Sequence, residues 1–539
     1  MKELTDKQIQ QLFPFPPRGK QEEIVKKILE AYRNGKQHVV LSLPTGGGKS
    51  VIAYAIAKYF NSAYVLTNQK ILQEQYRKDL HVPYILGRNN YICKKDNNLT
   101  CELGVCKRET KLFCKDCPYL LHKDAARHSW ITNMNYAYFL NIIKANQIEP
   151  RSILIMDEAH VLENELLKAG TIRITERILH ILGIYNLTLP KVKESDYNKQ
   201  TWLFSKLLPK LREQFLYYKN QIKTYQNFKF SRETQKLIHK YMALDRLVSI
   251  LLEIQKELED KQKIIIQSGE DFIDCKLLYG YNLFEKYFAK YGKVFLHMSA
   301  TILNKEQYCK KLNLASEDVE YIEYESEFPI ENRLIHYIPV GSLSWKNKAK
   351  TIPILIKKVE ELLNTHKNEK GIIHTVNYEL AEIITNELYD KPCGHRLLIP
   401  RGSNRQTILD TFYESKNPYV LISPSLTEGL DLKDELSRFC IICKMPFANI
   451  SDKWIKTRMV LDQTWYNNFT AEQLIQMTGR SIRSKDDYAT TYILDQDFMY
   501  FAQNNYYLLP QWWKNAVIER IKIKVTFCKM LPYTYNIFI

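Results

Sequence analysis

The sequence lacks the segments by which proteins are exported or cross membranes. Its first residues, M-K-E-L-T-D-K-Q, contain no apolar core of a signal peptide. No uncharged apolar run reaches the length of about 18 residues that a membrane span needs. Internal repeats and low-complexity segments are also absent. We therefore expect a monomeric globular protein with no membrane contact. It would be cytoplasmic, in an AT-rich bacterium or in the host of a phage that encodes it.

The length and charge of the chain limit its organisation and its partners. With 539 residues, of which 45% are hydrophobic and 25% charged, it is an ordinary globular protein of at least two domains. Its formal net charge of +17 favours a polyanionic partner, and nucleic acid is the first candidate. The alternative is lysine enrichment from a biased genome, which the many Asn, Ile and Tyr residues also favour.

Eleven cysteines occur, and five of them are clustered. Without an export signal we expect a reducing environment, in which clustered cysteines are metal ligands before they are disulfides. Grouped thiolates select zinc or an iron–sulfur cluster. The spacing is not that of two regular C-x2-C pairs, and scattered core cysteines are the alternative. The five are Cys93, Cys101, Cys106, Cys114 and Cys117.

The strongest motif is Val39–Ser50, V-V-L-S-L-P-T-G-G-G-K-S. An apolar strand leads into a glycine loop and then into a helix, which is the context that a phosphate-binding P-loop requires. Lys49 would reach the β- and γ-phosphates of a nucleotide, and the Ser50 hydroxyl would bind Mg²⁺. Leu43 stands where the strict motif has its first glycine, and an ordinary glycine turn is the alternative. The loop residues are Pro44, Thr45, Gly46, Gly47 and Gly48.

A second apolar strand, Ser152–Asp157, is followed by Glu158, Ala159 and His160. This is the Walker B arrangement: Asp157 would hold the Mg²⁺ shell and Glu158 would orient and deprotonate the attacking water. His160 would couple the nucleotide state to neighbouring elements. A plain acidic loop is the alternative.

Two weaker signals lie near the P-loop. Arg18 and Gln21 fall one turn apart at the start of an amphipathic helix, and a glutamine offers both a donor and an acceptor to an adenine edge. Thr67, Asn68 and Gln69 end the next predicted strand, where they would contact a nucleic-acid backbone.

The middle of the chain, residues 165–270, is predicted to be mostly helical, and we interpret it as a structural insertion. Apolar side chains at alternating spacings of four and three predict a helical hairpin or bundle seam. They are Leu237, Tyr241, Leu244, Val248, Leu251 and Leu258.

A second α/β pattern begins near Arg333. A strand over 419–431 leads into Glu428-Gly429-Leu430-Asp431, and a helix is predicted over Ala471–Arg483. On that helix Gln476, Arg480 and Arg483 share one face. Two arginines so placed would reach a γ-phosphate across a cleft, whereas an exposed basic helix is the alternative.

Together these motifs resemble superfamily 2 helicases of the XPD/DinG branch. They occur in the family's order: R-x-x-Q, P-T-G-G-G-K-S, D-E-A-H, S-A-T at Ser299–Thr301, E-G-L-D and Q-M-T-G-R-S-I-R. The most specific part is the cysteine-rich insertion between P-loop and D-E-A-H, which in this branch holds a [4Fe–4S] cluster. The resemblance assigns its ligands as Cys93, Cys101, Cys106 and Cys117, with Cys114 a spare or an exchangeable fourth ligand.

The resemblance implies an α/β fold with two RecA-like P-loop NTPase domains. The first domain comprises residues 1–87, 129–164 and 271–330. It is interrupted by the iron–sulfur insertion at 88–128 and a helical arch at 165–270, and residues 331–539 form the second domain. ATP and Mg²⁺ would bind between the two domains, where Arg480 and Arg483 act as arginine fingers. Arg18, Gln21, Gly429, Asp431 and Gln476 would complete the nucleotide site.

The implied activity is an ATP-dependent DNA helicase that moves 5′→3′ on single-stranded DNA and unwinds forked duplexes in replication, recombination or repair. The alternative is a nucleic-acid-stimulated ATPase switch or remodeler. It would carry a zinc- or cluster-stapled binding finger and would not separate strands.

Overall fold

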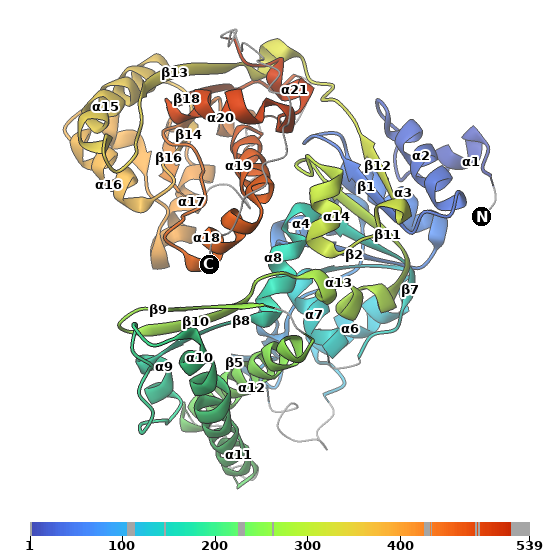
Figure 1. Cartoon of the computed structure of the whole chain (residues 1–539). Coiled ribbons are helices and arrows are strands. Elements are labelled where there is room, and N and C mark those ends of the chain that lie inside the picture. The colour runs from blue at the N-terminus through green and yellow to red at the C-terminus, as the bar shows by residue number, and fades with distance from the viewer. Residues whose placement is uncertain are drawn as a thin grey trace, which may run out of the picture. The chain divides into compact units, whose positions relative to one another are not determined.

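The computed structural model describes residues 3–104, 114–144, 147–224, 232–260, 263–424, 432, 434–479, 482 and 486–518. The chain forms two compact units (Figure 1). The first comprises Met1–Glu327 together with Ala448–Phe469, and the second comprises Phe328–Phe447 together with Thr470–Ile539. Residues 448–469 were expected in the second domain, but they pack with the first unit. The expected α/β class is confirmed in both units.

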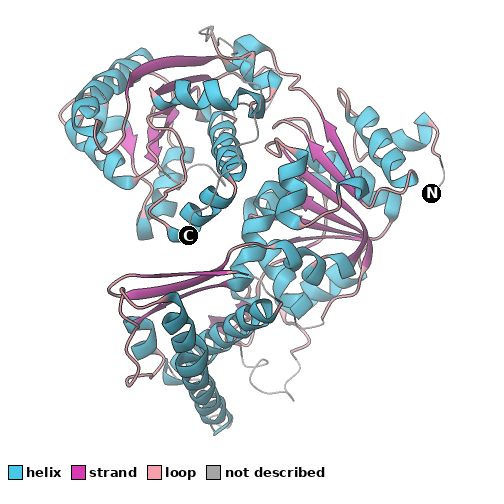
Figure 2. Cartoon of the chain, in the orientation of Figure 1, coloured by secondary structure: helices cyan, strands magenta, loops and turns pink. Residues whose placement is uncertain are grey.

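The first unit is built on a seven-stranded parallel sheet in the order β12-β1-β11-β7-β2-β6-β3. Its central strands are continuous apolar runs because helices cover both faces (Figure 2). The strands are β1 (His38–Ser42), β2 (Ala63–Thr67), β3 (Tyr84–Ile85), β6 (Ile131–Asn135), β7 (Arg151–Asp157), β11 (Gly292–Ser299) and β12 (Val319–Glu323).

Successive strand residues serve the two faces in turn. Val39 and Leu41 join the core under α2 (Gln21–Arg33), α3 (Lys49–Phe60) and α4 (Lys70–Leu80). On the other face His38 contacts Phe284 and Tyr64 contacts Phe139. The remaining helices around this sheet are α1 (Asp6–Gln10), α6 (Pro118–His128), α7 (Tyr136–Lys144), α8 (Leu162–Leu167), α13 (Tyr281–Tyr287) and α14 (Lys305–Leu312).

The insertion after β7 contains the predicted helices and also a three-stranded antiparallel sheet, in the order β8-β10-β9. The predicted seam residues all belong to one core, with Leu244 and Leu251 fully buried. The sheet was not predicted, although Ile172 and Ile174 alternate with polar residues. The elements are β8 (Thr171–Thr175), α9 (Glu176–Ile181), α10 (Asp196–Thr201), α11 (Leu208–Thr224), α12 (Arg232–Glu259), β9 (Ile264–Ser268) and β10 (Phe272–Leu277).

The cysteine-rich segment begins as a hairpin of β4 (Ile92–Cys93) and β5 (Asp96–Thr100). It ends at Cys117, the residue that caps α6, where Pro118 occupies the first helical position.

The second unit is a six-stranded parallel sheet in the order β13-β18-β17-β14-β16-β15. The helix predicted over 471–483 begins earlier, since α19 spans Gln463–Thr478. The strands are β13 (Ile335–Gly341), β14 (Gly371–His374), β15 (Leu397–Leu398), β16 (Val420–Ser423), β17 (Phe439–Ile442) and β18 (Thr490–Asp495). Its other helices are α15 (Lys348–Thr365), α16 (Tyr378–Glu387), α17 (Arg405–Glu414), α20 (Asp497–Asn505) and α21 (Gln511–Lys514). Helix α18 (Lys453–Leu461) lies within residues 448–469 and so belongs to the first unit.

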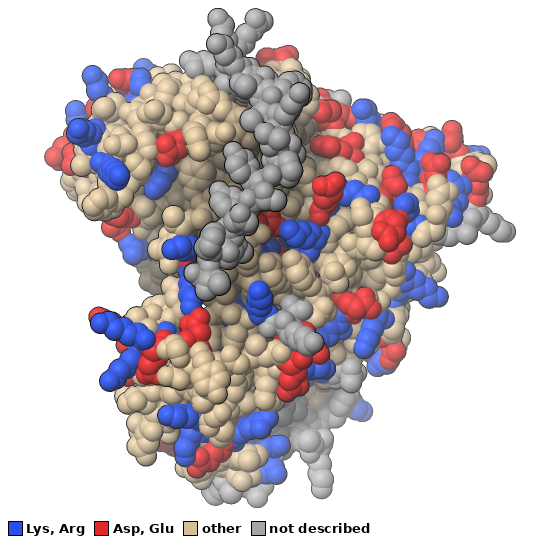
Figure 3. Space-filling model, viewed as in Figure 1, with Lys and Arg blue, Asp and Glu red and all other residues tan. Residues whose placement is uncertain are grey.

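Two surface properties bear on partners. None of the helices in the described residues has both the length and the apolar character needed to cross a bilayer. On the face shown in Figure 3, lysine and arginine side chains are interspersed with acidic ones, so the positive excess is not gathered into one uniform patch there.

Candidate nucleotide-binding site

Three motifs that lie far apart in the sequence end side by side in the first sheet. Strand β11 lies between β1 and β7, with Ser42 opposite Ser299 and Met298 opposite Asp157. The carboxyl ends of these strands therefore bring the P-loop, S-A-T and D-E-A-H to one edge. In open parallel sheets this edge is where ligands bind.

The P-loop has a backbone that only glycine adopts without strain. Gly46 has φ +82° and Gly48 has φ +76°, and α3 starts directly afterwards at Lys49. The start of a helix presents unpaired N–H groups and positive dipole charge to an anion. Lys49 Nζ donates to the Leu43 carbonyl oxygen at 3.1 Å, so it lies over the loop that would hold a phosphate. The residues here fit an ATP phosphate chain.

The departure at Leu43 has a structural explanation. A Cβ atom at Gly47 would lie 2.7 Å from Leu43 Cγ, and Leu43 itself is buried. The leucine side chain fills the space beneath the loop and requires glycine at 47 instead of 43.

Gln21 contacts the P-loop directly, whereas Arg18 is exposed. The Gln21 side chain accepts a hydrogen bond from the Arg18 backbone N–H at 2.9 Å, and its Nε2 donates to the Gly47 carbonyl oxygen at 3.5 Å. The amide is therefore beside the loop that would hold the phosphates. The adenine contact predicted for Gln21 and the place of Arg18 in the nucleotide site stay predictions.

Asp157 is held on three sides at the end of β7. Its Oδ2 accepts from the Tyr76 hydroxyl at 3.0 Å, and its Oδ1 accepts from the Glu158 N–H at 3.0 Å. Its backbone oxygen accepts from the Tyr136 hydroxyl at 2.9 Å. Burial and then the Glu158 carboxylate raise the pKa of Asp157 to about 6, while Lys49 and Tyr76 act against this rise. A buried carboxylate of this kind fits Mg²⁺, whose charge would favour the ionised form.

Glu158 begins a chain of polar contacts to the S-A-T strand. Its backbone has φ +53°, a strained conformation for a non-glycine residue and one that clusters at active sites. His160 Nδ1 lies 3.3 Å from Glu158 Oε2 and 2.8 Å from Ser299 Oγ. Ser299 Oγ also accepts from the Thr301 N–H at 3.1 Å. His160 therefore contacts the S-A-T strand through Ser299, and its predicted coupling of the nucleotide state to neighbouring elements stays a prediction.

The second-domain residues of the predicted site are only partly visible. Gln476 lies half-buried on α19. Gly429, Asp431, Arg480 and Arg483 lie outside the described residues. Their contribution to a composite site stays a prediction.

The described cysteines of the cluster are buried. Cys101 Sγ and Cys117 Sγ lie 3.8 Å apart, and the Cys117 N–H donates to the Cys114 carbonyl at 3.2 Å. A Cβ at Gly104 would lie 3.2 Å from Cys93 Sγ. Within the part of the chain that the structure describes, no three His, Cys, Asp or Glu side chains are placed to hold a metal ion. Cys106, one of the four predicted ligands, lies outside the described residues.

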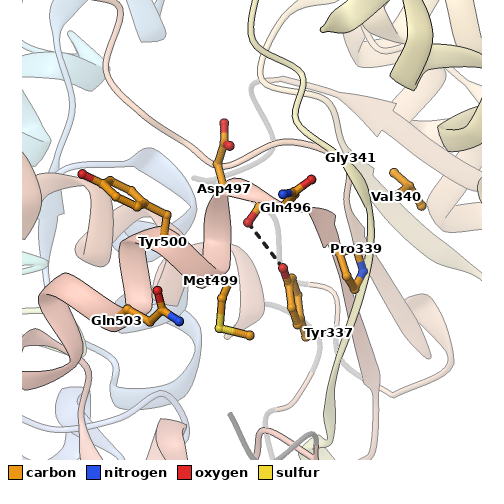
Figure 4. Close-up of a pocket in the computed structure, with 9 residues that line it drawn as sticks. All are labelled: Tyr337, Pro339, Val340, Gly341, Gln496, Asp497, Met499, Tyr500 and Gln503. Carbon is orange, nitrogen blue, oxygen red and sulfur yellow. Dashed lines mark hydrogen bonds between the residues drawn. The ribbon is translucent and has the colours of Figure 1, made fainter. Parts of the chain in front are cut away.

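The second unit has an open cavity of about 660 Å³ between β13 and α20 (Figure 4). The Tyr337 hydroxyl donates to the Gln496 backbone oxygen at 3.3 Å at its wall, and Asp497, Met499 and Tyr500 surround it. None of the described residues that line it is a lysine or arginine, so they offer no positive side chain to a nucleotide's phosphates.

The sequence interpretation missed the two tyrosines that hold Asp157. Tyr76 falls on the buried face of α4 with Gln73 and Leu80, a spacing that indicates burial. No local pattern links either tyrosine to Asp157, because that contact depends on the order of strands in the sheet.

Family models match both halves of the chain. The helicase C-terminal domain matches residues 359–516, and the res subunit of type III restriction enzymes matches residues 14–184.

Individual proteins resemble this chain over different shares of its length. A probable ATP-dependent helicase of Methanocaldococcus jannaschii is 24% identical, covering 91% of this chain and 93% of that protein. ATP-dependent DNA helicase CHL1 of Vanderwaltozyma polyspora is 25% identical over 21% of this chain and 17% of its own length. A solved XPD helicase superposes with a TM-score of 0.64 at 16% identity, covering 91% of this chain and 98% of that one. The S. tokodaii Xpd4 structure has a TM-score of 0.57 at 16% identity, covering 93% and 99%. The fold is therefore that of two RecA-like helicase domains.

Proposed function

We propose that this chain, an ATP-hydrolysing superfamily 2 helicase of the XPD/DinG type, moves 5′→3′ on single-stranded DNA and unwinds forked duplex DNA in replication, recombination or repair. The observation that carries the proposal is the meeting of P-loop, S-A-T and D-E-A-H at adjacent strand ends. At this edge of one sheet lie a loop that can bind phosphates, the carboxylate of Asp157 as a metal ligand, and Glu158 as a base.

Each residue of that edge has a role in hydrolysis. Lys49 and Ser50 hold the phosphates and Mg²⁺, and Asp157 completes the metal shell. Glu158 orients the attacking water and takes its proton. Mg²⁺ neutralises the charge that develops on the phosphates when it is bound.

The second domain completes the site. Arg480 and Arg483 stabilise the charge at the γ-phosphate, a contribution of about 10³–10⁵ in rate for arginine fingers. The proposal also assigns nucleotide binding to Gln476, Gly429 and Asp431. Because the arginines act only when the cleft is closed, each hydrolysis cycle opens and closes the domains and moves the bound strand.

Cys93, Cys101, Cys106 and Cys117 of the cysteine-rich insertion would hold a [4Fe–4S] cluster, and the insertion and the arch would together separate the strands. The support for the cluster is the burial of the described thiols. The 3.8 Å separation of the Cys101 and Cys117 sulfurs is instead that of two thiolates on one tetrahedral ion with bonds of about 2.3 Å. Thiolate sets of this kind also accept zinc, so metal analysis of the purified protein distinguishes the two.

ATP hydrolysis measured with and without single-stranded DNA tests the proposal, with the matched RNA as a second ligand. We expect DNA to raise turnover severalfold, and Lys49→Ala to remove both basal and stimulated turnover. Hydrolysis that DNA does not change would overturn the assignment of DNA. Stimulation without strand separation would favour an ATPase switch.

A further inference from the structure

The carboxylate of Asp157 has one fixed donor on each oxygen. Oδ1 accepts from the backbone N–H of Glu158, and Oδ2 accepts from the Tyr76 hydroxyl, both at 3.0 Å. An ionised carboxylate has about four acceptor positions. The two bonds therefore set the plane of the group and leave acceptor positions for a metal ion or its water.

Tyr76 is well placed to hold this orientation. Its side chain is only 1% exposed and Asp157 is 4% exposed, so no bulk water competes for the hydrogen bond. Helix α4 is itself anchored, because Gln73 on the same buried face donates to the Ile85 carbonyl oxygen at 3.2 Å. Rotation of α4 away from Asp157 would therefore also break the buried hydrogen bond from Gln73 to Ile85.

The position of α4 gives this bond a further consequence. The helix follows β2, the strand next to β7, and it begins at Lys70, directly after Thr67, Asn68 and Gln69. Those residues end the strand at the ligand-binding edge of the sheet. The same helix therefore links the residues that end β2 to the carboxylate that ends β7, at one edge of the sheet.

We propose that Tyr76 is a positioning residue for the metal site: its hydroxyl orients the Asp157 carboxylate for Mg²⁺ and ties that carboxylate to α4. The inference rests on the proposed function, because it requires Asp157 to hold the metal. Tyr76 touches neither nucleotide nor metal and acts only through Asp157.

A matched control exists in the same structure. Tyr136 is also buried, and its hydroxyl donates to Asp157 at 2.9 Å, but to the backbone oxygen instead of the carboxylate. Tyr76→Phe and Tyr136→Phe each remove one hydroxyl and one hydrogen bond to Asp157. Only the first changes the metal-binding group.

The experiment measures binding of Mn²⁺, as a paramagnetic substitute for Mg²⁺, by electron paramagnetic resonance on the full chain with saturating ADP. Hydrogen bonds to charged groups are worth enough for about a tenfold effect. We expect Tyr76→Phe to weaken Mn²⁺ binding about tenfold and to raise the Mg²⁺ concentration for half-maximal hydrolysis similarly. Nucleotide binding without metal should be unchanged, and Tyr136→Phe should alter metal binding less than about twofold.

The inference is overturned if Tyr76→Phe binds Mn²⁺ as the unmodified chain does, or if Tyr136→Phe weakens binding equally. It is also overturned if Tyr76→Phe fails to fold while Tyr136→Phe folds, since the hydroxyl would then serve the fold. In an Asp157→Asn background, removing the Tyr76 hydroxyl should have no further effect. If Asp157→Asn alone leaves Mn²⁺ binding intact, the proposed role of Asp157 fails, whatever Tyr76 does.

Discussion

Arg458 and Glu163 form a buried ion pair, with Arg458 Nη1 donating to Glu163 Oε1 at 2.9 Å and side chains only 3% and 6% exposed. Arg458 lies on α18, within residues 448–469, and Glu163 lies on α8, three residues beyond His160. The Arg458 guanidinium also donates to the Leu278 carbonyl oxygen and lies over the ring of Trp465. The pair therefore joins a segment from late in the chain to the helix that follows D-E-A-H.

Arg458→Met should destabilise the first unit by about 3–5 kcal/mol, because it leaves the Glu163 carboxylate buried without its partner. Chemical unfolding measures the loss. The double variant Arg458→Met/Glu163→Met should recover much of the lost stability, since neither charge of the pair then remains buried. Lys453→Met is the control: Lys453 pairs with Asp196 but both side chains are exposed, so about 1 kcal/mol or less is expected. An equal loss in both single variants would contradict the role given to burial.

Glu158→Gln should reduce ATP turnover by about 10²–10⁴, because the amide cannot take the proton of the attacking water. ATP affinity, measured with a fluorescent analogue, should change little, since the phosphates are held by the P-loop and Lys49. Glu165→Gln makes the same change of charge on α8 and should leave turnover intact. Full turnover in Glu158→Gln would remove this residue from its role as the base.

Two buried histidines predict loss of stability in acid. His38 Nδ1 lies 3.1 Å from His297 Nε2, and His297 Nδ1 lies 2.8 Å from the Tyr308 hydroxyl. Burial lowers the pKa of His38 to about 4, and burial followed by His38 lowers the pKa of His297 well below its usual value. The unfolded chain binds these protons near pH ~6.5, whereas the folded chain does not. The free energy of unfolding should therefore decrease as pH falls from about 6.5 towards 4.

His38→Asn checks that pH dependence, because asparagine keeps a donor N–H near His297 and does not titrate. Urea unfolding at several pH values should show a shallower decline for this variant than for the unmodified chain. His395→Asn, at an exposed position, should leave the slope unchanged. Parallel curves for all three proteins would show that His38 does not contribute to the acid sensitivity.

Cys93→Ser should abolish metal binding and strand separation but leave most basal ATP hydrolysis. The reason is that the cysteine-rich insertion contains none of the P-loop, S-A-T and D-E-A-H residues. Elemental analysis for iron and zinc, and the colour of the protein, measure the first effect. Cys393→Ser is the control, since Cys393 is a buried cysteine of the second unit. Retention of iron by Cys93→Ser would exclude Cys93 from the ligand set.

The α/β fold and the motifs at the carboxyl ends of β1 and β7 could be predicted because the sequence patterns that indicate them are local. Strands such as Val39–Leu41 and Ile153–Met156 are continuous apolar runs, as expected when helices cover both faces of a parallel sheet. The glycine loop and the acidic pair follow these strands directly. The topology then brings them together as the resemblance to helicases implied.

What could not be predicted depends on contacts between distant segments. Strands β8 and β10 are short alternating patterns beside long helices, and each is stable only because neighbouring strands of the sheet pair with it. The packing of Arg458 against Glu163 cannot be inferred from either helix alone. The bond from Tyr76 to Asp157 requires the order of β2 and β7, which no local pattern contains.

Unwinding of a labelled duplex with a 5′ tail, compared with 3′-tailed and blunt duplexes, tests whether this protein is a 5′→3′ DNA helicase. We expect ATP-dependent strand separation of the 5′-tailed substrate, little for the other two, and none with Glu158→Gln. DNA-stimulated ATP hydrolysis without separation of any of the three substrates would contradict it.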